Sequence, residues 1–410
     1  MTAERRSWVA DPDRIVVAGP LARYVCGFRT EAVRLGFVQS SVASQLQMME
    51  RLSQWLADAG LDPAQATPEV VQEFVQARRC RGYTDAVSRQ GLGPLLSYLR
   101  SRSIIPPALQ LAVDTPAETL LAQFGNYLVR ERGLAAKTVR QYVDHSRIFL
   151  RSLPDPLTEA LAGLTASQVT EFLLAECHTR SVGSAKAMVK ALRSLLRFCH
   201  VEGHVPIQLA PIVPAVAGWT LSWLPRGVSS DQVAKLLASC DRGRASGRRD
   251  YAVLMLLCRL GLRIGEVTAL ELDDIDWRSG QLLIRGKARR RDALPLPVDV
   301  GEALVDYLRH ARPACPSRRV IITARAPRQA VSTSAVQQIV YGACARAGLP
   351  PISPHRLRHT VATDLLRLGA SLIEVGQVLR HRDQLSTAIY AKADREALRR
   401  LAPAWPGGAA

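Results

Sequence analysis

The stretch PHRLRHTVATDLL, residues 354–366, decides the fold of the C-terminal part of the chain. It lies in a region whose apolar residues follow a helical pattern from Ser332 almost to the C-terminus. Pro354 stands where proline is favoured, in the first turn of a helix. The segment 355–359 therefore opens a helix, and its histidines and arginines are residue types that bind phosphate groups.

Other basic residues stand at the edges of predicted elements. Arg263, in the sequence GLRIGEV, lies where one helix ends and the next begins. Strand patterns over 281–285 and 293–297 enclose the basic turn GKARRRD, so they predict a β-hairpin with Lys287 in its turn. A third strand is predicted at 319–322.

The composition indicates a polyanionic partner. Among 410 residues, 54 lysines and arginines stand against 36 acidic residues, which gives a formal net charge of +18. Such an excess favours nucleic acid or an anionic membrane surface over small neutral molecules. No window approaches the ~20 apolar residues that cross a bilayer, and the N-terminus lacks the apolar run of a secretory signal. We therefore expect a cytoplasmic, nucleoid-associated protein that does not bind membranes.

The eight cysteines are scattered, and no C-x-x-C pair occurs. Most of them stand inside apolar helical stretches. This pattern predicts buried free thiols in a reducing compartment, rather than disulfides or zinc ligands.

The N-terminal half contains an internal repeat. Gly36-Phe37 recurs 97 residues later as Gly133-Leu134, and LLSY at 95–98 recurs 100 residues later as LLRF. We expect two four-helix units of about 100 residues, each ended by a proline. The proline-rich segment that follows the second unit is typical of a linker.

Five short motifs occur in a fixed order along the chain: GLRIGEV, RGKARRRDALPLP, HRLRHTVATDLL, VLRHRD and TAIYA. In that order they contain Arg263, Lys287, His355 with Arg358, His381 and Tyr390. Together they resemble the tyrosine recombinase (phage integrase) family over residues 229–402. The resemblance extends more loosely over 116–202, which is similar to the helical core-binding domain of that family.

The resemblance implies a mainly α fold, with helical SAM-like core-binding domains and a mixed α/β catalytic domain that is mostly helical with a small β-sheet. The domains expected are an N-terminal helical domain that is a degenerate repeat of the core-binding domain (1–112), the core-binding domain itself (113–205), a linker (206–228), the catalytic domain (229–402) and a disordered tail (403–410).

The motif residues suit metal-free cleavage of a phosphodiester. The reaction needs a nucleophile, cations that stabilise the pentavalent transition state, and a proton donor for the leaving alkoxide. Tyr390 can attack phosphorus, while Arg263 and Arg358 can each donate two parallel hydrogen bonds to non-bridging oxygens. Lys287 can protonate the departing 5′ oxygen, and His355 can shuttle the proton of the nucleophile.

The resemblance implies further roles. His381 binds the scissile phosphate or positions Tyr390, and Glu266 stands where the family often has an acidic residue that orients the site. A 3′-phosphotyrosyl intermediate is implied, with strand exchange that needs no ATP, cofactor or essential metal. Two positions depart from the family pattern, because Arg380 and Ala288 replace common glycines.

A second feature indicates DNA binding. Four basic residues recur at spacings of 4, 3 and 4 and so line one face of a helix, although a solvated surface face is an open alternative. The residues expected to contact DNA are Lys137, Arg140, Lys186, Lys190, Arg193, Arg197, Arg289 and Arg290. The matching helix of the first repeat, near 88–99, lacks this basic face, so the first repeat is not expected to bind DNA in the same way.

The predicted function is site-specific breakage and rejoining of double-stranded DNA during integration or transposition of a mobile element. Four protomers, or sibling recombinases, would assemble on two sites, and EALRRL at 396–401 would dock into a neighbour. The roughly 110 extra N-terminal residues favour this role over chromosome resolution. Three alternatives stay open: Xer-like resolution of DNA multimers, relaxation of DNA in the manner of a type IB topoisomerase, and DNA binding without catalysis.

Overall fold

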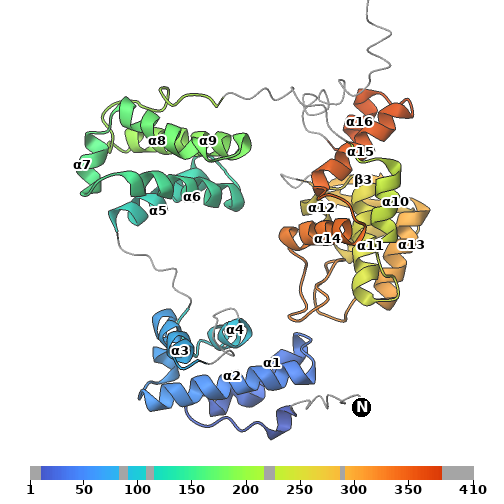
Figure 1. Cartoon of the computed structure of the whole chain (residues 1–410), viewed down its shortest axis with the longest axis horizontal. Coiled ribbons are helices and arrows are strands. Elements are labelled where there is room, and N and C mark those ends of the chain that lie inside the picture. Colours follow the sequence, from blue (N-terminus) through green and yellow to red (C-terminus); the bar gives the residue numbers. More distant parts are fainter. Residues whose placement is uncertain (1–10, 83–90, 108–114, 217–226, 287–290, 381–410) are drawn as a thin grey trace, which may run out of the picture. The chain divides into compact units, whose positions relative to one another are not determined.

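The computed structural model describes residues 11–82, 91–107, 115–216, 227–286 and 291–380 (Figure 1). The chain divides into two compact units, one formed by Ala108–Ser222 and the other by Met1–Pro107 with Trp223–Ala410. Separate clusters of buried hydrophobic residues fill an N-terminal, a middle and a C-terminal stretch. Within the described residues, no helix is both long and apolar enough to span a bilayer.

The N-terminal stretch folds around a core of its own. Its elements are η1 (Pro12–Arg14), η2 (Ala22–Tyr24), α1 (Val25–Arg34), α2 (Gln39–Asp58), η3 (Pro63–Gln65), α3 (Pro68–Cys80) and α4 (Gly93–Ser101). Thr67 caps α3 by accepting the N–H of Val70, and Pro68 occupies its first turn. Phe28 of α1 packs against Tyr98 of α4 with 5.4 Å between ring centroids, which closes the core between the first and last helices.

The middle stretch repeats this order of elements. It contains α5 (Pro116–Arg130), α6 (Ala136–Ser152), α7 (Leu157–Ala162), α8 (Ala166–His178) and α9 (Val182–Val201). The short helix α7 stands where η3 stands in the first stretch. Phe124 of α5 packs against Phe198 of α9 at 5.4 Å, as the corresponding rings of α1 and α4 do. The repeat in sequence therefore corresponds to a repeat in structure, with four main helices in each copy.

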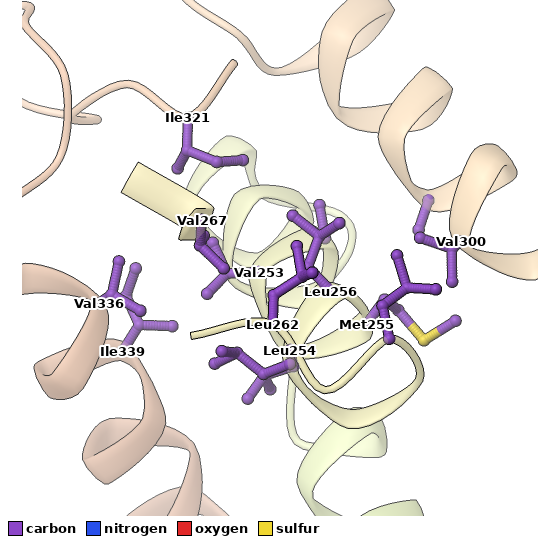
Figure 2. Packing of buried hydrophobic residues seen from close by; sticks show 14 of the residues in the cluster. Val253, Leu254, Met255, Leu256, Leu262, Val267, Val300, Ile321, Val336 and Ile339 are labelled. Carbon is purple, nitrogen blue, oxygen red and sulfur yellow. The ribbon is translucent and has the colours of Figure 1, made fainter. Parts of the chain in front are cut away.

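The C-terminal stretch is built around the buried helix α11 (Ala245–Cys258). Around it lie α10 (Ser230–Ala238), α12 (Ile264–Ala269), η4 (Leu272–Asp274), α13 (Val298–His310), α14 (Thr333–Arg346), α15 (Pro354–Arg367) and α16 (Leu372–Val378). Figure 2 shows Leu254 and Leu256 of α11 in one cluster with Val300 of α13 and Val336 of α14. Helix α10 begins after Ser229, which accepts the N–H of Gln232 in a capping box.

The predicted hairpin is confirmed. Within the described residues, β1 (Ile275–Asp276), β2 (Gln281–Arg285) and β3 (Arg291–Pro295) form an antiparallel sheet in the order β1-β2-β3. Leu282 pairs with Leu294, and Arg285 pairs with Arg291. β3 thus begins two residues earlier than predicted, and this register leaves the basic turn between the two strand ends.

The strand predicted at 319–322 is wrong. This segment makes only isolated bridges, between Glu271 and Arg319 and between Ile322 and Ala330. Its backbone makes single hydrogen bonds to two different segments, from the N–H of Val320 to the carbonyl of Leu270 and from the N–H of Val331 to the carbonyl of Ile321, and its other groups bind side chains. The N–H of Ile322 donates to the Tyr307 hydroxyl at 3.1 Å, and Arg312 donates to the carbonyls of both Arg319 and Val320. A strand ladder cannot form where those groups are already occupied.

The prediction of buried thiols holds for only part of the cysteines. All eight are free thiols, and Cys199, Cys240 and Cys344 are buried. Cys26 and Cys80 are exposed, and each lies near an end of its helix. Burial raises the pKa of the Cys199 thiol to about 12, so this group stays protonated at neutral pH.

We expect Leu254→Ala to destabilise the C-terminal core by about 2–5 kcal/mol, because a fully buried side chain is replaced by a cavity. Urea unfolding of the full chain, followed by circular dichroism, measures the loss. Val298→Ala is the matched control, since Val298 begins α13 and is 78% exposed. Equal unfolding midpoints for the two variants would contradict the packing described.

Candidate active site

The buried side chain of Arg358 is the centre of the site. It lies in the second turn of α15, whose first turn is set by Pro354 and by the Ser353 hydroxyl, which accepts the N–H of Arg356. Only 2% of Arg358 is exposed. Its Nη1 donates to the carbonyl of Gly261 at 2.6 Å, and its Nη2 donates to the carbonyl of Leu379. One guanidinium therefore joins α15 to the loop before α12 and to the turn after α16.

The second arginine, Arg263, occupies the N-cap position of α12. Its Nη1 donates to Glu266 Oε1 at 2.7 Å, and its backbone N–H donates to Glu266 Oε2 at 2.8 Å. The side chain of Arg263 is 45% exposed, whereas that of Glu266 is 7% exposed. The carboxylate thus orients a guanidinium that still reaches solvent, where a phosphate can contact it.

Glu266 is ionised although it is buried. Burial alone would raise the pKa of its carboxyl group, but the positive charge of Arg380 and hydrogen bonds from Arg263 and Arg380 lower it overall. Arg380 Nη2 donates to Glu266 Oε2 at 2.8 Å. One carboxylate therefore lies between two guanidinium groups.

His355 stands beside both arginines. Burial of its imidazole lowers its pKa, and repulsion from Arg358 and then Arg263 lowers the pKa further. The His359 ring lies one turn along α15, with 4.2 Å between the two ring centroids. Burial and the positive potential of His355 and Arg358 lower the pKa of His359 to about 4. Both imidazoles are therefore neutral at pH 7, and a neutral imidazole can accept a proton.

The structure brings together the predicted site residues that it describes: Arg263, Glu266, His355 and Arg358. Lys287, Arg289, Arg290, His381 and Tyr390 lie outside the described residues. The chain on either side of the lysine is described, because β2 ends at Arg285 and β3 begins at Arg291. The residue before His381 is described as well, and its carbonyl accepts a long hydrogen bond of 3.4 Å from Arg263 Nη2.

Sequence reasoning missed the contribution of Arg380. It identified this residue only as a departure from the family pattern, whereas the structure places its side chain against Glu266. The two residues are 114 positions apart, so no local pattern could have paired them.

The basic residues expected on DNA have different surroundings. Lys137 and Arg140 are exposed at the start of α6, and Lys190 and Arg197 are exposed on α9. Lys186 is half-buried. Arg193 is half-buried as well, and its Nε and Nη2 donate to the carbonyl of Val213 at 3.2 and 2.6 Å. Arg193 thus ties α9 to the chain that follows it, and its predicted contact with DNA competes with this bond.

Known proteins show the same sequence patterns. The model of the phage integrase family matches residues 226–397, and that of the phage integrase N-terminal SAM-like domain matches residues 121–203. A protein of Sinorhizobium fredii named as an integrase/recombinase, y4rA, is 39% identical over 397 residues, which cover 95% of this chain and 96% of that protein. The tyrosine recombinase XerD of Mycobacterium tuberculosis is 32% identical over 313 residues, which cover 71% of this chain and 98% of XerD.

Solved structures share the fold. XerH bound to a palindromic difH substrate superposes with a TM-score of 0.54 at 20% identity, covering 71% of this chain and 97% of XerH. A lambda integrase tetramer bound to a Holliday junction superposes with a TM-score of 0.54 at 19% identity, and the match covers 73% of this chain and 86% of the lambda integrase chain. The chain belongs to the phage integrase family of tyrosine recombinases, which break and rejoin DNA strands. The fold predicted from this resemblance, mostly helical with a small sheet, is confirmed.

We expect the His355 imidazole to titrate below its ordinary pKa of 6.5, and therefore to be neutral at pH 7. NMR spectra of selectively labelled histidine measure the titration. Arg263→Ala removes one of the two repelling charges, so it is expected to raise the midpoint toward the ordinary value. A midpoint above the ordinary value in the unmodified protein would contradict this electrostatic arrangement.

We expect Glu266→Gln to destabilise the protein by about 3–5 kcal/mol at pH 7, because two guanidinium groups lose a buried partner. The pKa of Glu266 is lowered in the folded state, so its charge stabilises the fold above the ordinary carboxyl pKa, and this effect is lost as pH falls through the lowered value. Chemical unfolding at several pH values should show that the difference in free energy of unfolding between the unmodified protein and Glu266→Gln becomes smaller as the pH falls. Equal stability at neutral pH would contradict the pairing.

Proposed function

We propose that this protein is a site-specific DNA recombinase that moves a genetic element by cutting and rejoining duplex DNA through Tyr390. The observation that supports it most directly is the pair Arg263 and Arg358 next to a neutral His355. Two fixed guanidinium groups suit the non-bridging oxygens of a phosphate whose charge grows in the transition state. A neutral imidazole beside them suits removal of the phenol proton.

The reaction proceeds in two balanced steps. The phenol oxygen of Tyr390 attacks phosphorus while His355 takes its proton, and the bond to the 5′ oxygen breaks. Lys287 donates a proton to that oxygen, which leaves as a hydroxyl. The 5′ hydroxyl of the partner strand then attacks the 3′-phosphotyrosine and gives its proton to Lys287. The bond from phosphorus to Tyr390 breaks, and His355 returns the proton to the phenol oxygen. Because one phosphodiester bond is exchanged for another of similar energy, no external energy source is required.

A mobile-element role is supported by the lengths of the relatives. The match to the integrase/recombinase y4rA covers 95% of this chain. The match to XerD covers 98% of XerD but only 71% of this chain, so this chain is the longer of the two. The part of this chain beyond the XerD match is long enough to hold the N-terminal helical stretch, which has its own core. XerD-like resolution of DNA multimers is the second candidate, favoured by the similarity to XerD over the remaining sequence.

The proposed partners are double-stranded DNA and further copies of the chain. Lys137, Arg140, Lys190 and Arg197 are exposed cations that can bind phosphates. The lambda integrase neighbour is a tetramer on a Holliday junction, and a tetramer on two DNA sites is the assembly we propose here. The segment 396–401, which would dock into a neighbour, lies outside the described residues. The reaction would take place on nucleoid DNA in the cytoplasm.

A covalent trapping experiment tests the proposed chemistry. The full chain selects its site from a library of random duplexes, and the selected sequence is then prepared with a nick next to the cleaved bond. We expect a protein–DNA adduct on a denaturing gel, and we expect Tyr390→Phe to bind this DNA without forming the adduct. An adduct in Tyr390→Phe would place the nucleophile elsewhere, and binding without any adduct would favour a non-catalytic DNA-binding protein.

A plasmid carrying two selected sites distinguishes recombination from relaxation. Exchange of the flanking DNA supports a recombinase. Relaxed circles without exchange would instead support the topoisomerase-like alternative.

A further inference from the structure

We propose that Arg380 is a positioning residue for strand cleavage, which holds Glu266 and, through it, Arg263. The proposal rests on the proposed function, since it assigns a role within the same site. Arg380 lies directly after the C-cap residue of α16, in the turn that leads to His381.

The side chain of Arg380 binds both Glu266 and the backbone of its own turn. Its Nη2 donates to Glu266 Oε2 at 2.8 Å, and its Nη1 donates to the carbonyl of Val378 at 2.8 Å. The other carboxylate oxygen of Glu266 binds Nη1 of Arg263 at 2.7 Å. Arg380 and the backbone N–H of Arg263 both donate to Oε2, so together they restrict rotation of the carboxylate and leave Oε1 for the side chain of Arg263.

The same turn contacts both site arginines through its backbone. The carbonyl of Leu379 accepts a hydrogen bond from Arg358, and the carbonyl of Arg380 accepts the long hydrogen bond from Arg263. The hydrogen bond from the Arg380 side chain to the carbonyl of Val378 stabilises the conformation of this turn. Its side chain thus couples the positions of the two guanidinium groups that would bind the phosphate.

Arg380 stands in this place at a cost to stability. Its φ of +54° is a left-handed conformation that favours glycine. Its side chain is only 4% exposed, so a charged group is desolvated. Its Nε is buried without a hydrogen-bond partner among the described residues. Three unfavourable features at one residue beside the site indicate retention for function rather than for folding.

Charge also favours a role in anion binding. Arg263, Arg358 and Arg380 bring three positive charges to the region, and Glu266 neutralises one of them. Arg380 thus takes up part of the negative charge of Glu266 that would otherwise offset Arg263. This leaves Arg263 a stronger electrostatic partner for a phosphate.

The test compares Arg380→Gly, Arg380→Lys and Arg367→Ala on the nicked substrate described above. Glycine adopts the observed φ without strain, but Arg380→Gly leaves the buried Glu266 carboxylate without one of its two charged partners, so the variant is expected to fold with a lowered unfolding temperature. Arg380→Lys retains one donor for Glu266. Arg367→Ala is the matched control, because it removes a 74% exposed positive charge from the end of α15 without touching Glu266.

We expect Arg380→Gly to bind the DNA with a Kd within about twofold of the unmodified protein, and to form the adduct roughly 10- to 100-fold more slowly, as misplaced catalytic groups do. Arg380→Lys should recover part of the rate, and Arg367→Ala should leave it unchanged. This separation of binding from cleavage, with rescue by lysine, would not arise from a purely structural role.

Three results would overturn the proposal. One is an Arg380→Gly variant that cleaves at the unmodified rate, and another is a loss of DNA binding as large as the loss of cleavage. The third is an Arg367→Ala variant as slow as Arg380→Gly. If the unmodified chain itself forms no adduct, the proposed function fails first and this inference fails with it, whereas an adduct formed equally fast by both proteins contradicts the inference alone.

Discussion

The guanidinium of Arg358 is buried and bonded to two backbone carbonyls, those of Gly261 and Leu379. A charged group in this position is tolerated only while those acceptors stay in place. The three segments that it joins carry all the described groups of the site. The loop after Gly261 contains Arg263 and leads to Glu266, and α15 itself carries His355. The arrangement of the site therefore depends on this one buried donor and its two acceptors.

Much of this arrangement could be predicted from short-range patterns. Apolar spacing indicated the helices, Pro354 indicated the start of α15, and the basic turn between two strand patterns indicated the hairpin. The order of five motifs identified Arg263, His355 and Arg358 as one site. These predictions succeeded because each rests on residues close together in sequence, or on a resemblance spread over a whole domain.

The predictions that failed, or were never made, depend on contacts between distant residues. The segment 319–322 has the residues of a strand, but Tyr307 and Arg312 bind the N–H of Ile322 and the carbonyl of Val320. The spacing of Arg193 on its helix did not indicate that its guanidinium binds the carbonyl of Val213, and its contact with DNA stays a prediction. In the sequence, Arg380 is recognisable only as a residue that replaces a common glycine, and its ion pair with the distant Glu266 is visible only in the structure. Side-chain spacing along one helix does not reveal which backbone carbonyl or carboxylate will lie nearby.

The ion pairs at the end of β2 limit the reach of the lysine. Arg285 Nη2 binds Glu271 at 2.7 Å and Asp274 at 2.9 Å, so the strand end is tied to the segment before β1. Lys287 follows two residues later, and two residues of extended chain span at most about 7 Å. The α-carbon of Lys287 therefore lies within about 7 Å of the α-carbon of Arg285. The proposed proton donation by its amine therefore requires a substrate atom within that distance plus the length of the lysine side chain.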